Sequence, residues 1–176
     1  MTSAATIIIC TGLTRKTISP ELHLQSSLDN VGRSEIARLM GTGNEAGQGP
    51  LPSFLRLACL KQTPGRGDAH VLFVANAAMP DESGPTSDVA TQPGDALQEP
   101  FRELTSDAGI VVPEPGLIPW DGLRRKIDMI VGSHPAAKST SPRFLVVGCH
   151  TENHVLAISL ALRQLAGFGE VAVCSH

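Results

Sequence analysis

The stretch FLVVGCHTENHVLAISLAL, residues 144–162, decides the fold. It opens with an apolar run up to Gly148, which is typical of a buried strand. It then repeats apolar residues at helical spacing in Val155, Ile158 and Leu162. A buried strand that passes at once into a helix is the building unit of an α/β protein with a parallel sheet. Such proteins usually place their chemistry where the strand end meets the helix N-terminus.

Three side chains that are capable of chemistry lie at this junction, namely Cys149, His150 and His154. A helix N-terminus disfavours the imidazolium form, so His154 could serve there as a neutral base or acid. The plainer alternative is that Cys149 packs as a small hydrophobe and that the histidines face solvent or a shallow cleft. We expect no metal at these three residues, because adjacent ligands rarely point at one ion.

The remaining apolar runs extend the same pattern along the chain. Strands are predicted at 6–10, 70–75, 109–112, 143–148 and 170–174, and helices at 34–40, 51–61, 97–104, 120–131 and 153–165. Runs of Ile, Val and Leu without polar alternation are typical of parallel strands that are covered on both faces. We therefore predict a three-layer α/β/α sandwich with a mostly parallel, Rossmann-like sheet of about five strands, in which 6–10 is central between the strands at 70 and 143.

Length and composition narrow the class of protein. The 176 residues predict a single domain over 1–176, with a flexible insertion at 79–94 that is rich in Pro, Ser, Thr, Asp and Gly. A net charge of -3 and 3% aromatic residues argue against a nucleic-acid partner. No apolar run reaches the roughly 18 residues of a membrane helix, so we expect no membrane partner. The four cysteines follow no CxxC spacing, which favours reduced thiols and a cytoplasmic protein.

Motifs that hold the common cofactors are missing from the sequence. Neither GxGxxG nor GxxxxGK[ST] follows a predicted strand, so the usual phosphate-binding loops are absent and we expect no cofactor. The GxSxG turn of serine hydrolases is absent as well.

The block from 148 to 173 resembles the isochorismatase-like family, which includes the nicotinamidases and other cysteine hydrolases. That family follows its fourth strand with a motif of the form G-V-A-T-D-x-C-V, and Gly148, Thr151 and Val155 match it in place. The run GFGEV, 167–171, matches the turn that leads to the family's next strand. Upstream, 107–122 is similar to the family's third-strand region, with Trp120 at its aromatic position. The resemblance implies a hydrolase that acts on a small-molecule amide, ester or vinyl ether.

The resemblance also implies which residues occupy the catalytic positions. Active members use an Asp after the first strand, a Lys after the third and a Cys in the first turn of the helix after the fourth. Here Cys10, Glu114 and His154 stand at those positions. They are a thiol, a carboxylate and an imidazole, which are the ingredients of a Cys-His-acid triad. Cys149, His150 and Trp120 would line the substrate side of the same site.

Replacement of all three family residues leaves two functions open. In the first, the protein is a hydrolase that works through Cys10, Glu114 and His154, which we call the recast triad. In the second, it is a non-catalytic binding or assembly module on the same fold, with Cys10 a buried thiol, Glu114 a solvated carboxylate and His154 a polar first-turn residue. The family has a sixth strand and a helix beyond the fifth strand, and this sequence has neither after the strand predicted at 170–174. We therefore expect a shortened form of the family fold, or a sheet edge that a partner covers. An uncovered edge invites pairing, which predicts a homo-oligomer. The resemblance implies a small-molecule ligand.

Overall fold

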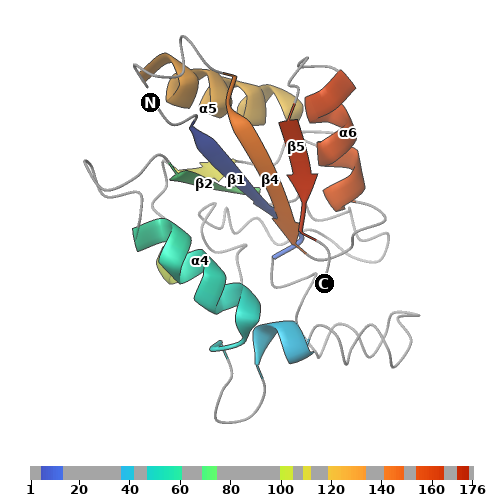
Figure 1. The fold of residues 1–176 in the computed structure, drawn as a ribbon. Helices are drawn as coiled ribbons and strands as arrows, with labels where there is room; N and C mark the ends of the chain where they lie inside the picture. Colours follow the sequence, from blue (N-terminus) through green and yellow to red (C-terminus); the bar gives the residue numbers. More distant parts are fainter. Residues whose placement is uncertain are drawn as a thin grey trace, which may run out of the picture.

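The structure is a computed structural model of the chain, shown as a ribbon in Figure 1. It describes residues 5–13, 37–41, 47–60, 69–74, 100–104, 109–111, 119–133, 141–148, 154–164 and 170–174. The insertion predicted at 79–94 lies outside these residues.

The strands form one sheet with β1 (Thr6–Thr11) at its centre. The other strands are β2 (Ala69–Val74), β3 (Ile110–Val111), β4 (Arg143–Gly148) and β5 (Glu170–Val173), in the order β3-β2-β1-β4-β5. Every pairing between neighbours in this order is parallel. The predicted parallel sheet, with the first strand between those at 70 and 143, is therefore confirmed, although β3 is only two residues long.

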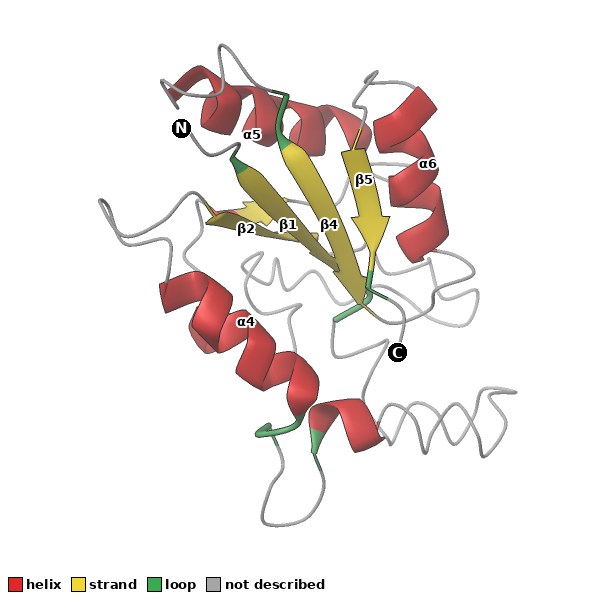
Figure 2. Cartoon of the chain, in the orientation of Figure 1, coloured by secondary structure: helices red, strands yellow, loops and turns green. Residues whose placement is uncertain are grey.

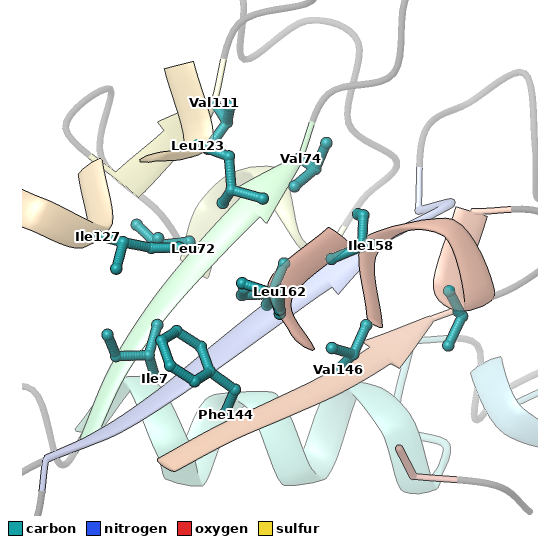
Figure 3. Packing of buried hydrophobic residues seen from close by; sticks show 12 residues of the cluster. Ile7, Leu72, Val74, Val111, Leu123, Ile127, Phe144, Val146, Ile158 and Leu162 are labelled. Atoms are coloured by element: carbon teal, nitrogen blue, oxygen red, sulfur yellow. The ribbon is translucent and has the colours of Figure 1, made fainter. Parts of the chain in front are cut away.

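Helices cover both faces of this sheet. Alternation along β1 sends Ile8 and Cys10 towards α4 (Pro50–Leu60), and sends Ile7 and Ile9 towards the opposite face. We call these the α4 face and the α6 face. On the α6 face the strands pack against α5 (Trp120–Ser133) and α6 (Leu156–Gln164), as Figures 2 and 3 show. Burial on both faces explains why the strands read as continuous apolar runs.

The helices differ from their predicted spans mainly at the ends. The helix predicted at 153–165 is α only from Leu156, because His154 and Val155 have π geometry. Of the helix predicted at 97–104, the described residues contain a 3₁₀ turn, η3 (Arg102–Leu104). Residues 37–40 are helical, in agreement with the prediction for that segment. Within the described part of the chain, none of the helices combines the length and apolar character that crossing a membrane requires.

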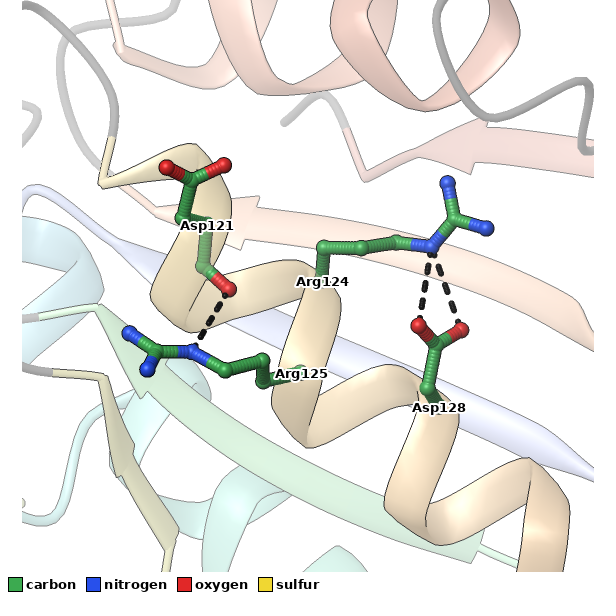
Figure 4. Close-up of polar contacts among 4 residues, drawn as sticks. All are labelled: Asp121, Arg124, Arg125 and Asp128. Atoms are coloured by element: carbon green, nitrogen blue, oxygen red, sulfur yellow. Dashed lines mark hydrogen bonds and ion pairs between the residues drawn. The ribbon is translucent and has the colours of Figure 1, made fainter.

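The exposed side of α5 stabilises itself through side-chain contacts one turn apart. Arg124 Nε donates to both carboxylate oxygens of Asp128, at 3.1 and 3.2 Å, and Arg125 Nε donates to the Asp121 carbonyl at 3.2 Å (Figure 4). Leu123 on the other side of the helix is fully buried. The helix is therefore amphipathic, with its apolar side on the sheet and the Arg124–Asp128 ion pair in solvent.

Candidate functional site

The strand order singles out one place on the sheet. From β1 the chain moves outward to β2 and β3, then returns to the other side of β1 to form β4 and β5. The direction of winding thus reverses between β1 and β4. Open α/β sheets bind ligands outside the carboxyl ends of the strands at such a switch point. The last register pair there is Thr11 with Gly148, and Figure 2 shows the two arrowheads side by side.

The backbone at Gly148 leaves no room for a side chain beside the end of β1. Its φ is 152°, in the region that favours glycine, and a Cβ added there would overlap the carbonyl oxygen of Thr11. No other residue fits without displacing a strand end. The glycine that the sequence motif singled out therefore has a steric role, and side-chain chemistry at the switch point must come from its neighbours.

Cys10 lies on the α4 face and is fully buried, with 0% of its surface exposed. Its cluster contains Leu55 of α4 and Phe73 of β2, together with other apolar side chains. Burial, together with the nearby thiol of Cys59, raises the pKa of the Cys10 thiol well above its usual range. The thiolate is the reactive form of cysteine, so this environment disfavours a nucleophile.

Thr11 is a residue that the sequence reasoning missed. It follows Ile9 by two positions on β1, so strand alternation directs its side chain to the α6 face. It is fully buried, and Gly12 beside it has a φ of 66° as the strand ends. Among the described residues, the buried polar side chains are those of Thr11 and Ser159, and Ser159 belongs to α6. A single polar residue directly after TIIIC was the signal that could have found it.

Two predicted site residues lie in elements of the α6 face. His154 is half-buried in the π turn, next to Val155, which packs in the cluster on that face. Trp120, the first residue of α5, is half-buried and packs against the same cluster. The structure thus brings the segments of His154 and Trp120 to one face of the sheet and the Cys10 side chain to the other.

The remaining predicted site residues, Glu114, Cys149 and His150, lie outside the described residues. Within the part of the chain that the structure describes, no group of three His, Cys, Asp or Glu side chains could hold a metal ion.

Comparison with protein-family models, curated proteins and solved structures found no match to this chain.

Proposed function

We propose that the protein binds a small organic amide, ester or vinyl ether at the β1–β4 switch point, on a three-layer α/β/α fold of the isochorismatase-like type. The observation that carries the proposal is the strand order, because it puts the reversal of winding at Thr11 and Gly148. The motif residue Gly148 lies at this point, and the motif residue Val155 follows it in the segment that leads into α6. The resemblance supplies the ligand class, and the topology supports the location.

Of the two functions that the sequence left open, the non-catalytic binding module has the better support. A cysteine hydrolase needs a thiolate that faces its substrate. Cys10 is instead buried on the α4 face, with a pKa raised by desolvation. The recast triad of Cys10, Glu114 and His154 remains the alternative, and it requires the Cys10 side chain to leave its cluster.

The proposal extends to compartment and assembly. Cys10, Cys59 and Cys174 are thiols rather than disulfides, which fits a reducing, cytoplasmic setting. In the described sheet β5 is an edge strand, and Val173 is exposed on it. An exposed edge supports a homo-oligomer, because an edge strand can pair with a strand of a second chain.

An NMR titration tests the binding site. The ¹⁵N-labelled protein is titrated to millimolar concentration with nicotinamide, phenyl acetate and ethyl vinyl ether, as probes of the three ligand classes. We expect at least one probe to shift the amide signals of Thr11, Gly12 and Gly148, with α4 signals as the internal control. Shifts confined to α4, or no shifts with any probe, would contradict the proposal.

Hydrolysis of 4-nitrophenyl acetate separates the two functions. If the protein is a binding module, any turnover above the buffer rate should persist in Cys10→Ala and in His154→Ala. Turnover that both substitutions abolish, in variants that remain folded by circular dichroism, would establish the hydrolase alternative instead.

A further inference from the structure

The start of α6 departs from regular helix geometry next to the candidate site. His154 and Val155 are in π geometry, and the α-helix proper begins at Leu156. A π turn inserts extra backbone into a helix, so it changes the direction in which the neighbouring side chains leave the axis. Such turns occur frequently at functional sites. The direction of His154 therefore depends on where the π geometry ends.

Ser159 forms a hydrogen bond at the place where the geometry changes. Its Oγ donates to the carbonyl oxygen of Val155 at 2.7 Å, one helical turn back. That carbonyl belongs to the last π residue before the α-helix. Serine bonds of this type bend a helix locally, because they draw the accepting carbonyl towards the hydroxyl.

The surroundings of this hydrogen bond hold it in one geometry. Ser159 is 8% exposed, and Val155 is packed in the cluster on the α6 face. Ile158 and Leu162 fix the same side of α6 against the sheet. Little water competes for the hydroxyl at this position, and a serine without this partner would leave a buried polar group unsatisfied.

From these observations we infer that Ser159 is a positioning residue, whose hydroxyl holds the junction between π and α geometry and thereby sets the direction of His154. The inference rests on the proposed function only in taking His154 as a site residue. Ser159 itself contacts no reacting atom in this account and acts through the Val155 carbonyl.

The test compares Ser159→Ala with Ser159→Thr and Ile158→Val by NMR of the full chain without ligand. Ser159→Ala removes the hydroxyl, whereas Thr keeps an oxygen that can make the same backward bond. Ile158→Val removes one buried methylene from the same helix face and is the control for general loosening of α6. The readouts are the ¹³C′ shift of Val155 and the ring ¹H and ¹³C shifts of His154.

We expect Ser159→Ala to move both the Val155 and the His154 signals and to give Val155 a carbonyl shift typical of a regular helix. Ser159→Thr should restore the wild-type positions, and Ile158→Val should leave them in place. The inference is overturned if His154 signals stay unchanged in Ser159→Ala, or if Ile158→Val moves them equally. Because no ligand is present, this outcome is independent of the probe titration, and each idea can fail alone.

Discussion

The two faces of the sheet differ at the end of β1, although both are well packed. On the α4 face the strand ends in Cys10, which sits in an apolar cluster with its pKa raised. On the α6 face it ends in Thr11, and the buried polar Ser159 lies in the helix above. Burial of polar groups is unfavourable unless they are paired, so proteins retain them where they have a role. The difference supports our proposal that the α4 face is structural and that ligand binding involves the α6 face.

The largest effect should come from Gly148, the glycine at which β4 lies against the end of β1. Gly148→Ala places a Cβ against the Thr11 carbonyl at a φ of 152°. We expect it to lower the free energy of unfolding by about 3 kcal/mol or more, measured by urea denaturation.

Gly132→Ala is the matched control for this substitution. Gly132 lies in α5, and a Cβ there meets nothing within 4 Å. It should be neutral or stabilising by about 0.5–1 kcal/mol, because alanine is the better helix former. Equal stability of the two variants would show that β1 and β4 do not approach as described.

A second comparison uses pH to probe the α4 face. The folded-state pKa of Cys10 is raised, so above the ordinary thiol value of about 8.5 the folded state holds a proton that the unfolded chain loses. The contribution of Cys10 to the free energy of unfolding is therefore fully present below that pH. It decreases as the pH rises further, by up to about 1.4 kcal/mol per pH unit. Urea denaturation between pH 7 and 10 measures the slope.

Substitution assigns this slope to its residue. Cys10→Ala should make the decline shallower, whereas Cys174→Ala should not change it, because Cys174 is exposed. A wild-type slope that persists in Cys10→Ala would mean that another group causes the decline.

The smallest effect concerns the edge of the sheet. Arg143 Nε on β4 donates to a Glu170 carboxylate oxygen on β5 at 2.9 Å, and both side chains are exposed. A double-mutant cycle with alanine at each position should give a coupling energy of only about 0.2–1 kcal/mol. A coupling above about 2 kcal/mol would mean that this edge is desolvated, as it would be under a partner chain.

The apolar runs were sufficient to predict the sheet. Short stretches such as TIIIC read as strands that are covered on both faces, and this reading placed β1 in the centre of the predicted sheet. The helical spacing in 51–61 and 120–131 located α4 and α5 to within a few residues. These features follow from local patterns of burial, which a sequence displays directly.

The face of the sheet on which each side chain at the end of β1 lies could not be predicted in the same way. A strand buried on both sides shows no alternation, so nothing in TIIIC indicates which side Cys10 takes. The family resemblance favoured Cys10 as a site residue, whereas the alternation of side chains along β1 favours Thr11. The π turn at His154 was not predicted either, because no residue pattern in the sequence marks it.

The central claim is that the thiol at the end of β1 is structural. Native-state alkylation of the cysteines tests this claim most directly. The folded protein is treated with iodoacetamide near neutral pH, and the modified peptides are followed over time by mass spectrometry in wild type and His154→Ala. Because Cys174 is exposed, Cys59 half-buried and Cys10 fully buried, we expect modification in that order. Cys10 should react only on unfolding, at the same rate in both proteins. Rapid alkylation of Cys10 in the native protein that slows in His154→Ala would contradict the account and establish a thiol activated by His154.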